Sequence, residues 1–106
     1  MPKYLVQASY SPEGAKGLIK DGGSKRRAAV ETAVTALGGS IEAFYFGLGD
    51  ADVVGIVELP DAVTAAAFSL VTNASGAVAL TTTPLLTPEE IDEATKKSVN
   101  YQPPGE

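Results

Sequence analysis

The order of segments along the chain is the feature that most constrains its fold. Patterns typical of strand, helix, strand, strand, helix and strand follow one another, with a glycine-rich turn at Gly47–Asp50 in the middle. The predicted strands cover residues 3–10, 40–46, 52–59 and 77–86, and the two main helices cover residues 25–37 and 62–72. This order predicts an α+β, ferredoxin-like split βαβ domain, in which helices cover one face of a four-stranded antiparallel sheet.

Short-range signals set the expected ends of the helices. A short helical turn is expected around residues 15–20, and Ser24 is expected to cap the first main helix at its N-terminus. Gly38 suits the left-handed position just beyond that helix, because glycine adopts positive φ without a steric penalty. Asp61 follows Pro60 and is expected to cap the second main helix.

A third, shorter helix is expected near the C-terminus. Residues 87–90 read Thr-Pro-Glu-Glu, a capping box with proline at the first helical position, and the helix is expected to run to about Lys97. The remaining residues have no apolar stripe. We therefore expect one domain over residues 1–97 and a flexible C-terminal tail over residues 98–106.

The predicted sheet has more apolar residues than one buried face needs. In the third strand, the alternation of Val53, Val57 and Leu59 with Val54 and Ile56 makes both faces apolar. Helices are expected to cover only one of these faces. A large exposed apolar face implies a partner, and the simplest partner is a second copy of the chain. The sequence therefore predicts a homodimer packed sheet to sheet.

The chain contains no histidine and no cysteine, so it lacks the usual general base, the soft metal ligands and the thiolate nucleophile. No cofactor and no metal site is expected. The net charge of −5 argues against a nucleic-acid partner, although Lys25–Arg27 is a short basic run. The absence of cysteine fits a reducing compartment, and no apolar run approaches the length of a membrane span. We therefore expect a cytoplasmic protein with no membrane association.

Five residues are candidates for a functional site. Asp52 and Tyr45 are the candidate catalytic groups, as bases whose pKa burial can tune. The candidate ligand-binding residues are these two together with Tyr4, Tyr10 and Arg26, since tyrosine hydroxyls can bind a carbonyl group and arginine can hold an anion.

Each candidate also has a purely structural interpretation. Asp52 can accept backbone hydrogen bonds that fix the turn or the start of a strand. Aromatic residues on strands commonly belong to a core or an interface. Arg26 and Arg27 can be solvated or paired with Glu13, Asp21 or Glu31.

The segment Phe44–Asp61, followed by an alanine-rich helix that contains Phe68, resembles the GYD family of small bacterial proteins. The opening Met-Pro-Lys-Tyr-Leu and the run Thr81–Thr83 are similar to that family as well, so the resemblance covers roughly residues 2–97. The resemblance implies a ferredoxin-like chain of the dimeric α+β barrel type. It implies no particular reaction, because related families include enzymes, sensors and binding proteins.

The GYD signature itself is only partly present. The family motif is Gly-x-Tyr-Asp, and this chain reads Gly49-Asp50-Ala51-Asp52 at the expected hairpin. Ala51 replaces the tyrosine, so no role of that tyrosine can be assigned to this chain.

Three functional hypotheses follow. The first is a dimeric protein that binds a small apolar or anionic molecule in a cleft between sheet and helices. The second is a cofactor-independent oxygenase or isomerase, with Asp52 or Tyr45 as the base and Arg26 as an anion anchor. The third is a protein-interaction module that uses its open sheet face.

Overall fold

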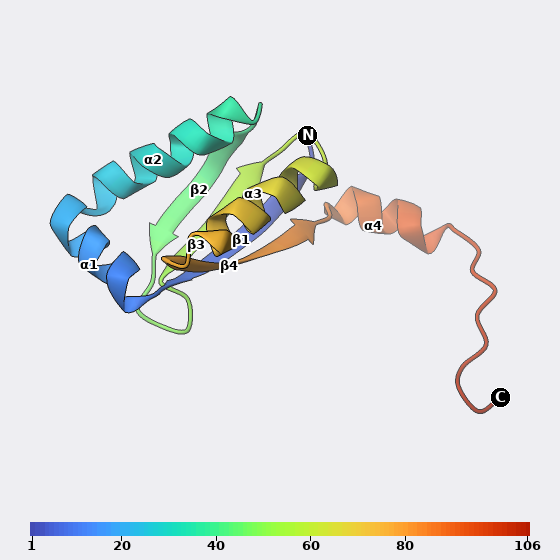
Figure 1. The fold of residues 1–106 in the computed structure, drawn as a ribbon. Helices are drawn as coiled ribbons and strands as arrows, with labels where there is room; N and C mark the ends of the chain where they lie inside the picture. The colour runs from blue at the N-terminus through green and yellow to red at the C-terminus, as the bar shows by residue number, and fades with distance from the viewer.

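A computed structural model describes all residues 1–106 and shows one four-stranded antiparallel sheet with helices on one face (Figure 1). The strands lie in the order β2-β3-β1-β4, and each pair of neighbours is antiparallel. This is the predicted split βαβ arrangement. The elements are β1 (Lys3–Tyr10), α1 (Pro12–Asp21), α2 (Gly23–Ala36), β2 (Ser40–Phe46), β3 (Val53–Glu58), α3 (Ala62–Ala74), β4 (Val78–Leu85) and α4 (Pro88–Thr95).

The hydrophobic core lies between the sheet and the helices α2 and α3. Alternate residues of β1 and β3 are buried against the helices, as their sequence pattern predicts. Val34 of α2 and Leu59 after β3 are 0% exposed, and Ala65 of α3 belongs to the same cluster. A second, smaller cluster at the other end of the sheet contains Ala8, Val53 and Val78.

The N-terminal part of α2 differs from the prediction. The expected short turn is a complete helix, α1, whose N-cap is Ser11; its hydroxyl accepts a hydrogen bond from the Gly14 N–H. Ser24 is not an N-cap but lies inside α2. Gly22, with φ of 83°, joins the two helices directly and leaves the start of α2 without a side-chain cap. Because glycine adopts positive φ without a steric penalty, the chain changes direction at this one residue, and α2 follows α1 without an intervening loop.

The end of α2 and the start of α3 agree with the prediction. Gly38 has φ of 84°, and the N–H groups of Gly39 and Gly38 bond back to Val34 and Thr35, a Schellman motif. The Asp61 side chain caps α3 by accepting a hydrogen bond from the Thr64 N–H at 2.8 Å. Hydrogen bonds from Thr64 lower the pKa of Asp61, since they favour the ionised carboxylate.

Helix α4 projects away from the sheet, and the C-terminal segment continues outward from it (Figure 1). It begins with the predicted capping box, in which Thr87 and Glu90 bond to each other's backbone N–H groups. The helix exposes Ile91, and residues 98–106 form no helix or strand. Flexibility of this tail stays a prediction. No helix of the protein combines the length and the apolar character that crossing a membrane requires.

The face of the sheet opposite α2 and α3 is covered by no element of the chain (Figure 1). Strand register brings Leu5 beside Ile56, and Tyr45 beside Val54, on this open face. Charged groups gather at one end, where Lys3 Nζ lies 2.6 Å from Glu42 Oε1; this hydrogen bond raises the pKa of Lys3. The open face therefore has an apolar strip formed by Leu5, Val54 and Ile56, polar residues beside it at Gln7, Thr81 and Thr83, and a charged end.

Candidate functional site

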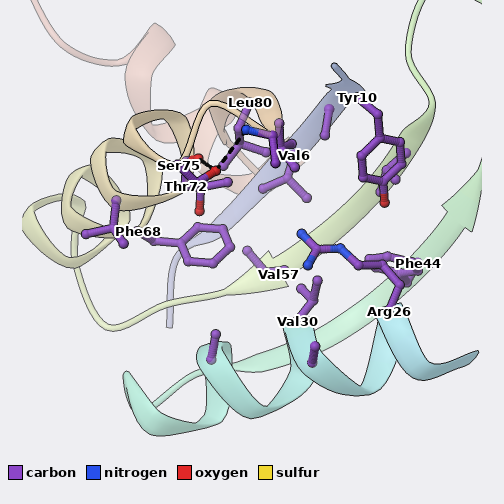
Figure 2. Close-up of a pocket in the computed structure, with 17 residues that line it drawn as sticks. Val6, Tyr10, Arg26, Val30, Phe44, Val57, Phe68, Thr72, Ser75 and Leu80 are labelled. Atoms are coloured by element: carbon purple, nitrogen blue, oxygen red, sulfur yellow. Dashed lines mark hydrogen bonds between the residues drawn. The ribbon is translucent and has the colours of Figure 1, made fainter. Parts of the chain in front are cut away.

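A cavity of about 400 Å³ lies between the sheet, α2 and α3 (Figure 2). Its volume falls in the range of small-molecule binding sites. Three of the 17 lining residues are polar: Arg26, Thr72 and Ser75. The hydrophobic lining comes from all four strands, from both helices and from the segment after α3: Val6, Ala8, Tyr10, Ala29, Val30, Ala33, Phe44, Val53, Val57, Phe68, Val71, Ala77, Val78 and Leu80.

The cavity exists because small side chains stand where larger ones would fill the space. Ala29 and Ala33 of α2 both line the cavity and are exposed, so it opens to solvent alongside this helix. At the opposite end, Val34 and Ala65 pack in the core and close the space between the helices. The arrangement is a pocket with an apolar floor and one open side, which suits a molecule that is mostly apolar.

Arg26 is the only charged residue that lines this cavity. Figure 2 shows its side chain reaching from α2 into the cavity. Its two basic neighbours are paired: Lys25 lies 3.5 Å from Asp21, and Arg27 lies 3.4 Å from Glu31. Arg26 itself forms no ion pair and no side-chain hydrogen bond.

Helix geometry explains why Arg26 has no partner. Side chains meet on a helix at spacings of three and four residues. For Arg26 these positions hold Gly22, Gly23, Ala29 and Val30, none of which carries an acid. The predicted pairing with Glu13, Asp21 or Glu31 is therefore confirmed for Arg27, which holds Glu31, and is wrong for Arg26: Glu13 lies 3.6 Å from Lys16, and Asp21 holds Lys25.

Two hydroxyl groups complete the polar side of the cavity. The ring of Tyr10 comes from the end of β1, and Figure 2 shows its hydroxyl turned toward the space that Arg26 enters. Thr72 on α3 lines the opposite wall. Neither hydroxyl forms a hydrogen bond within the chain, whereas Ser75 donates to the Thr72 carbonyl at 2.7 Å and accepts from the Ala77 N–H. The cavity therefore offers a free guanidinium and two free hydroxyls in an apolar setting.

Asp52 lies beside this cavity but does not line it. It lines a neighbouring hollow of about 390 Å³ together with Tyr10, Phe46 and Gly47. Its Oδ2 accepts a hydrogen bond from the Tyr10 N–H at 2.8 Å, and its own N–H donates to the Ala8 carbonyl at 2.7 Å. These bonds fasten the end of β1 to the hairpin, as in the structural interpretation of this residue. Asp52 thereby fixes the position of Tyr10.

The structure brings together only part of the predicted site. Tyr10 and Arg26 line the same cavity, and Asp52 is bonded to Tyr10. Tyr4 is 4% exposed and belongs to the core cluster instead. Tyr45 is 72% exposed and points away from the cavity, on the open face.

The orientation of Tyr45 follows from an irregularity in β2. The pairing with β3 shifts between Ile41 and Ala43, so that the alternation of faces is interrupted at this point. As a result, Phe44 and Phe46 point toward the helices, and Tyr45 points to the open face. Phe44 and Phe68 of the cavity lining were not among the predicted site residues; the aromatic enrichment of residues 44–46 was the available signal for the first of them.

Two substitutions at Asp52 should separate its structural role from a chemical one. Asp52→Ala leaves the Tyr10 N–H without its partner, so we expect a loss of about 1–3 kcal/mol of unfolding free energy in urea denaturation. Asp52→Asn keeps an acceptor oxygen at the same place and should cost less than about 1 kcal/mol. If Asp52→Asn is as stable as the unchanged protein but no longer binds small molecules, the carboxylate acts on the ligand itself.

The acidic residues form no group of three or more that is placed to hold a metal ion. A family model for the GYD domain matches residues 4–95, which is most of the 106-residue chain. No curated protein and no solved structure matches the chain. The match spans β1 to the last turn of α4, so it includes every element that lines the cavity. The chain therefore belongs to the GYD family.

Proposed function

We propose that the protein binds a small, mostly apolar molecule in the cavity between the sheet, α2 and α3. One observation supports this above all: a cavity of about 400 Å³ has a hydrophobic lining and contains a single charged side chain without a partner, that of Arg26. Sites for small molecules combine an apolar lining with a few polar groups that fix the ligand's orientation. At about 30 Å³ for each water-sized group, the volume suits a ligand of roughly a dozen non-hydrogen atoms.

Ligand binding has more support than catalysis. The enzymatic hypothesis requires Asp52 or Tyr45 to act as a base on the bound molecule. Neither residue lines the cavity: Asp52 is engaged by the Tyr10 N–H, and Tyr45 lies on the other face of the sheet. A base must reach the proton that it abstracts, directly or through one water molecule.

A large side chain that fills the cavity should weaken the binding of an apolar probe. We expect 1-octanol to shift the NMR signals of Val30 and Phe68 in the unchanged protein. In Ala33→Phe, the phenyl ring occupies the space that octanol needs, so we expect the affinity for octanol to fall at least about 10-fold. Ala28→Phe is the matched control, since Ala28 is an exposed residue of α2 that does not line the cavity. If octanol instead shifts the NMR signals of Tyr45 and Val54, which lie on the open face of the sheet, the proposal is contradicted.

We also propose that the open face of the sheet is covered by the same face of a second copy. The apolar strip of this face, with Leu5, Val54 and Ile56 on adjacent strands, is what supports a partner. A two-fold axis through it would bring identical apolar surfaces together. This arrangement leaves the cavity, on the helix side of the sheet, accessible in both copies. A different protein as the partner would instead make the chain an interaction module.

A further inference from the structure

We infer that the ligand of the cavity is an amphipathic carboxylate: an apolar body with one carboxylate group, which Arg26 holds. This inference rests on the proposed function and adds the chemical class of the ligand. The location of the guanidinium carries it, because Arg26 enters an apolar cavity from α2 and finds no acid there.

An unpaired guanidinium is poorly accommodated by an apolar wall. Arg26 is half-buried as a residue and lines the apolar cavity, where its guanidinium has no protein partner. A carboxylate supplies the missing partner. Its two oxygens match the paired N–H groups of a guanidinium, which makes this contact stronger than one with a neutral acceptor.

The other polar groups of the cavity fit the same ligand. The free hydroxyl of Tyr10 is turned toward the space that Arg26 enters and can donate to a carboxylate oxygen (Figure 2). The rest of the lining, including Phe44 and Phe68, is apolar and suits an alkyl or aryl body. A cationic group on the ligand would find no partner, since no acidic residue lines the cavity.

The acids nearest to Arg26 do not compete for it in the structure. Glu13 and Asp21 line an adjacent hollow of about 220 Å³ together with Arg26, but their carboxylates hold Lys16 and Lys25. A single charge without a partner is thus left on the cavity side of α2. Replacing Arg26 should therefore leave the Glu13–Lys16 and Asp21–Lys25 pairs intact.

The test compares two probes of the same length, octanoate and 1-octanol, by NMR titration of the full chain. We expect Arg26→Gln to weaken octanoate binding about 10- to 100-fold, the range for losing a hydrogen bond to a charged group, and to change octanol binding less than about 3-fold. Arg27→Gln is the matched control, because Arg27 is the next residue of α2 and pairs with Glu31 outside the cavity. It should leave both affinities unchanged.

A thermal readout separates a ligand contact from a structural role. Without ligand, Arg26→Gln should melt at the same temperature as the unchanged protein or higher, since it removes a charge that has no partner in the protein. A clear drop in melting temperature would assign Arg26 to the fold and overturn the inference.

The remaining outcomes are distinguishable. Octanol binding in the cavity, combined with octanoate binding that Arg26→Gln does not weaken, overturns the carboxylate while the proposed function stands. If Arg26→Gln and Arg27→Gln weaken octanoate binding equally, the effect belongs to the surface charge of α2, and this result also overturns the inference. Failure of both probes to bind overturns the proposed function together with this inference.

Discussion

The Ile56→Lys variant is expected to be a folded monomer under conditions in which the unchanged chain is a dimer. Ile56 lies in β3 in the middle of the open face, where Leu5 and Ala43 are its neighbours across the strands. In a two-fold dimer the substitution places two ammonium groups in the apolar part of the interface, and their desolvation costs several kcal/mol. The dimer dissociation constant should therefore rise about 100-fold or more.

Sedimentation or light scattering measures the mass, and circular dichroism checks that the variant is folded. Val63→Lys is the matched control: Val63 is 79% exposed on α3, on the helix side of the sheet, and the variant should remain a dimer. The unchanged protein running as a monomer at micromolar concentration contradicts the proposed dimer. A dimeric Ile56→Lys variant would place the interface on another surface.

The fold was predictable because local signals and periodicity agree over most of the chain. Residues of β1 alternate between the two faces as a half-buried sheet requires, β3 is apolar on both faces as its sequence predicts, and Asp61 and Gly38 mark helix ends that the structure confirms. The error concerns α1, which was expected only as a short turn around residues 15–20, although Ser11 followed by Pro12 is a pattern typical of a helix start. Gly22 then made a cap at Ser24 unnecessary.

The candidate site was less predictable because it depends on which way side chains point. Tyr10 and Arg26 share the cavity, and β1 periodicity gave the direction of Tyr10. The direction of Tyr45 depends on the register shift in β2, and alternation of residue types does not reveal such a shift. The cavity itself is the space left between α2 and α3, and the separation of two helices is set by tertiary packing.

The Gly39→Ala variant should lose about 3 kcal/mol or more of unfolding free energy. Gly39 follows the Schellman turn of α2 and passes close to β3. A Cβ atom here would overlap the carbonyl oxygen of Glu58 and stand 2.9 Å from Cδ2 of the fully buried Leu59. Neither neighbour can move cheaply, since one is backbone and the other is core, so the overlap forces α2 away from the sheet.

Gly17→Ala makes the same chemical change where no atom lies within 4 Å, inside α1, and should raise stability by about 0.5–1 kcal/mol through helix propensity. Thermal denaturation compares the two: Gly39→Ala should melt at least roughly 10 °C lower than the unchanged protein. If Gly39→Ala is stable, octanol binding tests the consequence for the site, because a displaced α2 moves Arg26 and Ala33 together. If Gly39→Ala changes neither the stability nor the affinity for octanol, the close approach of Gly39 to β3 does not determine how far α2 lies from the sheet.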